Sequence, residues 1–161
     1  IGGGDWSANR IIPDCVRSIK KNSNLIIRNP NSTRPWQHAL EPISGYLLLA
    51  KKLYQNNKKF NGSWNFGPSV YKSIKVKDVV KLFFKYIGIN KKIIFKKANF
   101  KETNLLKLNS NKALRNLNWK NTWDMKNSII KTADWYLSYL KKKNLRKITT
   151  LQIKEYFKIN D

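Results

Sequence analysis

Apolar residues recur every three to four positions in several stretches of the chain, the spacing that places side chains on one face of a helix. The clearest stretch is 76–87, followed by Gly88, a residue suited to end a helix. The same spacing predicts helices over 12–19, with Pro13 in the first turn, and over 41–54. The apolar residues of this last stretch that share one face are Ile43, Leu47, Ala50 and Tyr54.

Three more helices are expected in the last third of the chain, and each has a polar residue placed to cap it. Ser110 can cap a short helix that reaches Leu117, and Thr122 can cap a longer one. A final short helix is predicted to start at Thr149, with Gln152 at the spacing of a capping box. Hydroxyl and amide side chains therefore mark the expected helix starts.

Short runs of β-branched and aromatic residues predict strands between these helices. The runs over 24–28 and 91–97 read as strands, and 64–68 reads as a strand end entering a turn. The glycine-rich opening, 1–10, and the proline-rich segment 28–42 are expected to be loops. Helices alternate with strands, and neither a repeat nor a domain boundary is visible. The predicted class is therefore α/β or α+β in a single region.

The net charge of +24 raises the possibility of a nucleic-acid partner. The chain holds 27 lysines against 6 arginines, together with 20 asparagines. Lysine, asparagine and isoleucine are encoded by A/T-rich codons, so mutational bias explains the basicity as well as selection for a polyanion does. The lysines are also scattered, with one run of three at 141–143. A basic nucleic-acid-binding module remains the rival hypothesis from a different class.

Composition and motifs exclude several kinds of protein. No apolar run approaches the roughly 18 residues that cross a bilayer, and the single Cys15 fits a reducing compartment, so we expect a cytoplasmic protein away from membranes. One histidine and one cysteine give no metal-ligand spacing. The chain has neither a nucleophile elbow nor a P-loop. Its Tyr-x-x-x-Lys matches, Tyr54/Lys58, Tyr71/Lys75 and Tyr139/Lys143, lie at helix ends, in a loop or in a charge run, as coincidence would place them.

One segment combines arginine with stiff and aromatic residues. "RNPNSTRPWQHALEP", residues 28–42, holds two arginines, three prolines, a tryptophan and the only histidine. A guanidinium offers a planar fork of donors that grips phosphate or carboxylate oxygens in a bidentate way, which lysine cannot do. Arg28 and Arg34 could therefore converge on one anion, with Trp36 shielding it from water. The alternative is a surface loop in which Arg34 pairs with a nearby acid, and His38 has a structural role.

Several motifs together resemble the CDP-glucose 4,6-dehydratase family of extended short-chain dehydrogenases/reductases. They are "IGGGDW", "R-IIPD", "IRNP---RPWQH-LEP-SGYLLLA-KLY", "WNFGP", "LKL" and "LNW". They cover almost the whole chain and match the C-terminal half of the family. The "RNP---RPWQH-LEP" block distinguishes this family from its relatives, which more often carry Arg-Asp-Trp or Arg-Asp-Tyr at that place. The resemblance implies the end of a Rossmann sheet plus a small α+β lobe that binds a nucleotide sugar.

The resemblance also implies a reaction and a cofactor for the whole protein. Such an enzyme uses NAD to convert CDP-glucose into CDP-4-keto-6-deoxyglucose and water, for bacterial surface polysaccharides. The family's NAD-binding turn and catalytic Tyr-x-x-x-Lys pair precede the part matched here, so no catalytic residue is assigned. Because the chain opens at Ile1 inside a glycine run, we expect a partial, inactive polypeptide of residues 1–161. The full-length protein is expected to form homo-oligomers.

The site residues implied by the resemblance bind substrate. Arg34 matches the arginine that contacts the diphosphate, Asn65 a position that hydrogen-bonds the nucleotide, and Arg28 a position beside the base and ribose. Arg10 matches a basic residue at the start of the helix that lines the site. The remaining implied residues are Asp5 and Trp6, which follow the strand leading to the sugar, and Glu102, in the segment that closes over the nucleotide.

The chain departs from the family pattern around Glu102. The closing segment reads "NFKETNLLKLN", in which Lys101 and Asn104 stand where histidines are expected. Another dehydratase or epimerase of the superfamily is the nearest alternative. Competition among CDP, UDP, GDP and dTDP would separate the two. The nucleic-acid hypothesis instead predicts salt-sensitive binding to random duplex that does not depend on Arg34.

Overall fold

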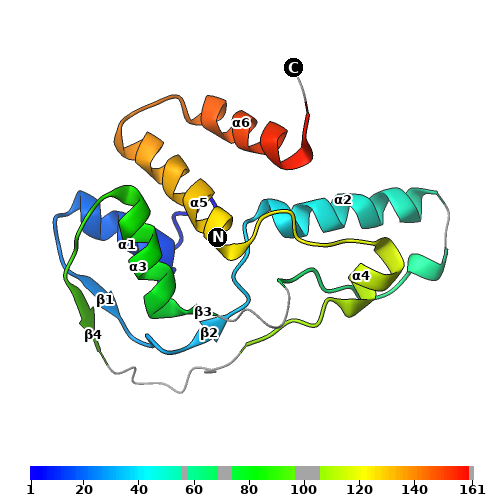
Figure 1. The fold of residues 1–161 in the computed structure, drawn as a ribbon, viewed down its shortest axis with the longest axis horizontal. Helices are drawn as coiled ribbons and strands as arrows, with labels where there is room; N and C mark the ends of the chain where they lie inside the picture. Colours follow the sequence, from blue (N-terminus) through cyan, green and yellow to red (C-terminus); the bar gives the residue numbers. More distant parts are fainter. Residues whose placement is uncertain (56–57, 69–73, 97–105, 160–161) are drawn as a thin grey trace.

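The computed structural model describes residues 1–55, 58–68, 74–96 and 106–159. It is an elongated α/β molecule in which the chain begins near the middle (Figure 1). Its elements, in chain order, are α1 (Ile11–Lys20), β1 (Leu25–Ile27), β2 (Thr33–Arg34), α2 (Leu40–Tyr54), the 3-10 helix η1 (Lys58–Phe60), β3 (Ile74–Lys75), α3 (Val76–Ile87), β4 (Ile93–Phe95), α4 (Asn111–Leu117), α5 (Met125–Leu140) and α6 (Leu145–Phe157).

The larger part of the molecule is built on the parallel strands β1 and β4. Leu25 lies opposite Ile93, and Ile27 lies opposite Phe95. Helices α1, α3 and α5 share an apolar core with these strands, and Phe83 and Tyr136 are among its fully buried side chains. This burial explains why the spaced apolar residues of α1 and α3 form helices here. Gly88 ends α3 in the left-handed conformation, with φ of 76°.

The narrower part of the molecule holds α2, η1 and α4 (Figure 1). Its core contains Phe60, Phe66 and Trp119. At Gly45 in α2, a β-carbon would lie 2.2 Å from the Phe66 ring. Glycine is therefore required for α2 to approach the 63–68 segment this closely.

A buried carboxylate joins the two parts. Glu41, in the first turn of α2, is 0% exposed. One of its oxygens accepts a hydrogen bond from the Trp123 backbone N–H (2.8 Å). The other accepts from the Thr122 backbone N–H (3.0 Å), the Tyr156 hydroxyl (2.8 Å) and the Asn121 side-chain amide (3.3 Å). Glu41 thus connects α2, the loop before α5, and α6.

The predicted helices are confirmed, but their caps are wrong in three places. Ser110 makes no capping bond, and its hydroxyl instead bonds both the N–H and the carbonyl of Gly67. Asp124, not Thr122, caps α5: the helix begins at Met125, and the Asp124 carboxylate accepts from the Asn127 backbone N–H at 2.8 Å. All three capping predictions relied on local spacing alone. In the structure, the hydroxyls of Ser110 and Thr149 form hydrogen bonds with Gly67 and Trp135 instead.

The last helix is longer than predicted. It begins at Leu145, with Asn144 accepting a hydrogen bond from the Lys147 backbone N–H at 3.0 Å. Thr149, the predicted start, lies inside the helix, and its hydroxyl accepts from the Trp135 indole N–H at 2.9 Å. The capping-box prediction at Thr149 is therefore wrong.

The strand predictions were correct for β1 and β4 but not for 64–68, which forms no regular structure. The segment 28–42, predicted to be a loop, contains the two-residue strand β2, which pairs antiparallel with β3 and places Arg34 opposite Ile74. The predicted apolar face of α2 is also largely exposed to solvent, with Leu47 58% and Tyr54 92% exposed.

Candidate functional site

The largest cavity lies where the start of α1 and the end of β1 face the segment that leads into α2. Its volume is about 1090 Å³. The side chains that carry polar chemistry into its lining are Asp5, Asn9, Arg10, Asp14, Arg28, Asn29, Arg34, Gln37 and His38. The polar lining therefore combines three arginines, two carboxylates and a histidine with three amide side chains.

Arg34 is held in the cavity wall by the short β2–β3 pairing. Its guanidinium donates to the Thr33 carbonyl at 2.9 Å. Two residues later, the Trp36 indole N–H donates to the Ile74 carbonyl at 2.9 Å. The wall that carries Arg34 is thus fixed by strand pairing and by the indole of Trp36.

Arg10 and Asp5 form an ion pair at the mouth of the cavity. Their closest atoms are 3.6 Å apart, and the Arg10 side chain is 69% exposed. Burial acts to raise the pKa of Asp5, but the Ser7 hydrogen bonds and the charge of Arg10 outweigh it and hold this pKa below its usual value. Asp5 therefore stays ionised and compensates part of the arginine charge.

His38 is 4% exposed and supports the wall of the cavity. Burial is the main cause that lowers the pKa of His38 to about 4, helped by the charges of the Ile1 ammonium and Lys131. Its Nδ1 accepts a hydrogen bond from the Leu40 backbone N–H, and its ring lies edge-on to Trp123. A neutral, packed imidazole fits the structural role expected for it.

Four of the predicted site residues, Arg10, Arg28, Arg34 and Asp5, line this one cavity. Of the other three, Trp6 and Asn65 lie outside its lining. Trp6 packs on the rings of Tyr136 and Tyr139 of α5. Asn65 is exposed and outside the lining, and Glu102 lies outside the described residues.

Gln37 ties the site together through three hydrogen bonds. Its side-chain amide donates to the Phe66 carbonyl at 2.8 Å and accepts from Asn121 at 3.3 Å. Its own carbonyl accepts from the Ile1 ammonium at 2.7 Å. Gln37 therefore fixes the backbone beside Asn65 to the cavity wall, although Asn65 does not line the cavity.

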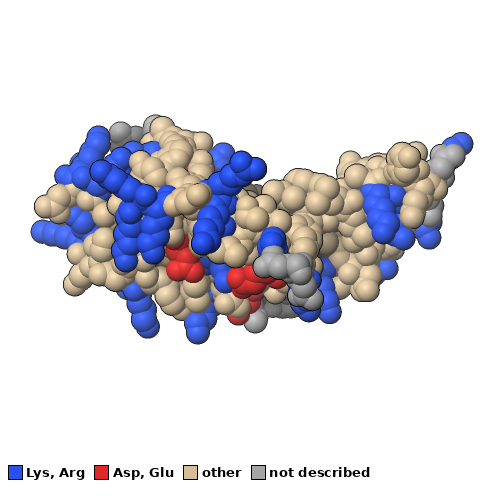
Figure 2. Space-filling model, turned by 90° about the horizontal axis from the view of Figure 1, so that it is seen from above, with Lys and Arg blue, Asp and Glu red and all other residues tan. Residues whose placement is uncertain are grey.

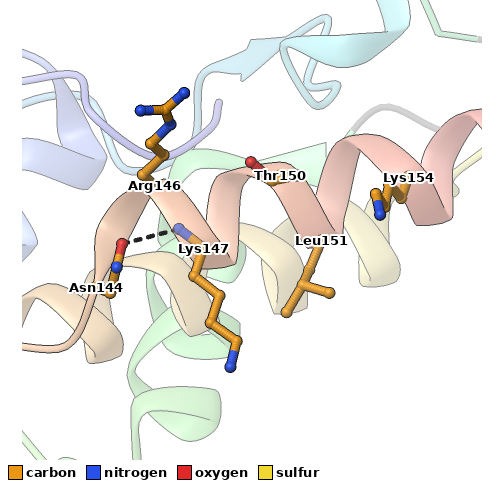
Figure 3. Close-up of a pocket in the computed structure, with 6 residues that line it drawn as sticks. All are labelled: Asn144, Arg146, Lys147, Thr150, Leu151 and Lys154. Carbon is orange, nitrogen blue, oxygen red and sulfur yellow. Dashed lines mark hydrogen bonds between the residues drawn. The ribbon is translucent and has the colours of Figure 1, made fainter. Parts of the chain in front are cut away.

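A second, shallower hollow lies on α6 (Figure 3). Its residues are Asn144, Arg146, Lys147, Thr150, Leu151 and Lys154. Figure 3 shows their side chains projecting outward from a single helix, with the Asn144 cap as the hydrogen bond drawn among them. Surface cations from one helix do not enclose a ligand, so the arginine-lined cavity is the better candidate site.

The basic side chains do not gather into one stripe on the face shown in Figure 2. They project singly and in small groups from both ends, with carboxylates between them. Among the described residues, no helix is long and apolar enough to cross a membrane, and no group of His, Cys, Asp or Glu could hold a metal ion.

The glycine run does not form a dinucleotide cradle. A β-carbon on Gly3 would lie 2.1 Å from the Trp135 ring, so this glycine is needed for packing against α5. The residues of this chain therefore do not fit the pyrophosphate of NAD at that run.

Comparison with the sequences of known proteins finds a relative that matches almost the whole chain. No family profile matches the chain. The CDP-glucose 4,6-dehydratase of Salmonella typhimurium is 36% identical over 157 residues, which are 97% of this chain and 44% of that protein. The chain thus spans less than half the length of this relative. The match confirms the resemblance drawn from the motifs.

Solved structures of low identity share the fold. The UDP-glucose 4-epimerase of Thermotoga maritima, solved with UDP-glucose, matches with a TM-score of 0.71 and 14% identity, over 87% of this chain and 44% of that one. The dTDP-glucose 4,6-dehydratase of Bacillus anthracis, solved with NAD, matches with a TM-score of 0.63 and 15% identity, over 83% of this chain and 41% of that one.

Proposed function

We propose that this chain, whose α/β fold is that of the C-terminal portion of an extended short-chain dehydrogenase/reductase, is the substrate-binding part of a CDP-glucose 4,6-dehydratase. The whole protein would convert CDP-glucose into CDP-4-keto-6-deoxyglucose and water. Its NAD would be bound mainly by residues outside this chain, because Gly3, in the middle of the glycine run, packs tightly against Trp135. The chain by itself would bind the nucleotide sugar without turning it over.

The observation that carries the proposal is the meeting of three arginines at one cavity. Arg10 comes from the start of α1, Arg28 follows β1, and Arg34 lies in β2, yet all three line the same space. Several guanidinium donors in the lining of one cavity would suit the oxygens of a diphosphate. A cavity of about 1090 Å³ also leaves room for a nucleoside and a sugar.

Burial distinguishes the roles of the cavity residues. Arg34 is half-buried in a strand pairing and donates to Thr33, so it is the arginine whose position is best fixed for the diphosphate. Arg10 is more exposed and shares its charge with Asp5. We therefore assign the main phosphate contact to Arg34 and a weaker, screened contribution to Arg10.

The site residues outside the cavity have indirect or separate roles in this proposal. Asn65 would approach the nucleotide from the segment that Gln37 fixes through the Phe66 carbonyl. Trp6 would hold the segment before α1 in place through its packing on α5 rather than through contact with the ligand. Glu102 remains an expectation from the resemblance.

The test is calorimetric titration of the 161-residue chain with CDP, UDP, GDP and dTDP at one salt concentration. Tightest binding of CDP is expected, together with a loss of roughly tenfold or more in Arg34→Ala, as for the removal of a charge-assisted bidentate contact. Arg146→Ala on α6 is the matched control and should bind as the unsubstituted chain does. A preference for UDP or dTDP would favour another dehydratase or epimerase instead.

A further inference from the structure

Asn9 and Arg28 contact each other at the mouth of the arginine-lined cavity. The Arg28 guanidinium donates to the Asn9 side-chain oxygen at 2.6 Å. Asn9 lies in the turn before α1, and Arg28 directly follows β1. Both line the cavity, so the contact joins two elements that are separate along the chain.

The backbone at Asn9 suits this residue. Its φ is 60°, in the left-handed region that asparagine tolerates better than most residues. A guanidinium has donors alone, so the oxygen of the Asn9 amide must be the atom that faces Arg28. The turn therefore presents one acceptor to one arginine.

The chemistry of this acceptor differs from that at the neighbouring arginines. Arg10 faces the carboxylate of Asp5, and Arg17 forms a short ion pair with the carboxylate of Asp14. Arg28 instead meets a neutral amide. A neutral acceptor fixes the direction of the guanidinium but leaves its positive charge uncompensated.

We propose that Asn9 is a positioning residue that holds the Arg28 guanidinium toward the cavity, where its remaining donors bind an acceptor oxygen of the bound nucleotide. This inference rests on the proposed function, because it takes a nucleoside diphosphate as the ligand. Asn9 itself need not touch the ligand. Its effect on binding must then pass through Arg28.

A double-mutant cycle tests this dependence. CDP is titrated calorimetrically into the unsubstituted chain, Asn9→Ala, Arg28→Ala and the double variant, with inorganic pyrophosphate as a second probe. We expect Asn9→Ala to weaken CDP binding about three- to tenfold and to have no further effect once Arg28 is alanine. Asn9→Asp keeps an acceptor oxygen in place but compensates the charge of Arg28, so it should still bind CDP more weakly than the unsubstituted chain.

Two controls separate positioning from folding. Asn118 also has a left-handed backbone, with φ of 52°, but lies at the end of α4 outside the cavity lining. Asn118→Ala should leave CDP affinity unchanged, and circular dichroism should show Asn9→Ala to be folded.

An equal loss for pyrophosphate would place the Arg28 contact on phosphate, and a loss confined to CDP would place it on the nucleoside.

The outcomes distinguish this inference from the proposed function. Additive losses in the cycle, or an unchanged affinity in Asn9→Ala, would overturn the positioning role while leaving nucleotide binding intact. Tighter binding of UDP than of CDP would contradict the proposed substrate, and the same cycle with UDP would then decide the role of Asn9. If the unsubstituted chain binds none of these probes, both inferences are wrong.

Discussion

The Gln37 side-chain amide donates to the Phe66 carbonyl at 2.8 Å, across 29 residues of sequence. This bond fixes the 63–68 segment to the wall of the arginine-lined cavity. Gln37 also accepts from Asn121, which donates in turn to the buried Glu41. The cavity wall is therefore continuous with the polar network that joins the two parts of the molecule, and several predictions about stability depend on that network.

Replacing Glu41 with glutamine is expected to destabilise the fold by about 2–4 kcal/mol, because an amide can accept at only one of the two positions where the carboxylate now accepts. The N–H groups of Thr122 and Trp123 cannot both remain satisfied. Urea unfolding at pH 7 measures the change. Glu155→Gln is the matched control, since its carboxylate pairs with Lys131 at the surface, and it should cost less than about 1 kcal/mol. Equal losses in the two variants would contradict the role given to Glu41.

Gly45→Ala is expected to destabilise the protein, although alanine favours a helix over glycine by roughly 1 kcal/mol. The added β-carbon would lie 2.2 Å from the Phe66 ring, so the ring or the helix must move. Thermal unfolding should show a lower midpoint for this variant. In a Phe66→Ala background the clash is absent, and Gly45→Ala should then be neutral or stabilising. A destabilising effect of the same size in both backgrounds would rule out the clash.

His38 is expected to make stability depend on pH in acid. Its pKa is lowered to about 4 in the fold, mainly by burial, whereas its ordinary value is 6.5. The unfolded chain therefore binds the proton first, and the stability present above pH 6.5 is lost as the pH falls toward 4. The shift corresponds to a loss on the order of 3 kcal/mol.

Urea unfolding at pH 7 and at pH 4.5 measures this loss. His38→Asn keeps an acceptor for the Leu40 backbone N–H but does not titrate in this range. The free energy of unfolding should therefore change less between the two pH values in this variant than in the unsubstituted chain, by the contribution of His38. The carboxylates contribute equally to both proteins. An unchanged difference would contradict the buried, neutral state of His38.

The exposed face of α2 is expected to promote self-association of the 161-residue chain. Ile43, Tyr46, Leu47 and Tyr54 are all exposed large hydrophobic residues on this one helix. The double substitution Leu47→Lys and Tyr54→Lys should reduce association in sedimentation velocity without lowering the unfolding midpoint. Leu151→Lys, at an exposed leucine on α6, is the control and should have less effect. Unchanged association in the double variant would exclude this face as the cause.

The sequence pattern predicted most helices because their spaced apolar residues are buried in a shared core, as in α3. It failed for the face of α2, since this helix is apolar on several sides and spacing alone cannot say which side is covered. The two-residue strands β2 and β3 have no period to detect, and they are fixed by their mutual pairing. Caps were misplaced where tertiary partners competed for the same polar groups, as Gly67 does for Ser110.

The sequence could identify those residues of the candidate site that carry a charge or belong to a motif of the family. Arg34, Arg28, Arg10 and Asp5 all line one cavity, and their binding of a nucleotide stays a prediction of the arginine argument and the resemblance. Asn9 was missed because an amide carries no distinctive local signal, and the partners of Gln37 could not be predicted from its place in the sequence. Their contacts with Arg28 and Phe66 arise only when distant segments of the chain are brought together.

The central claim is that the arginine-lined cavity binds a cytidine diphosphate, and titration of CDP into the chain and its Arg34→Lys variant tests it most directly. Lysine keeps the charge but loses the bidentate fork. The account predicts measurable CDP binding that weakens roughly tenfold in Arg34→Lys, with circular dichroism unchanged. Equal CDP affinity in the two proteins, or binding to random duplex DNA that exceeds binding to CDP, would contradict it.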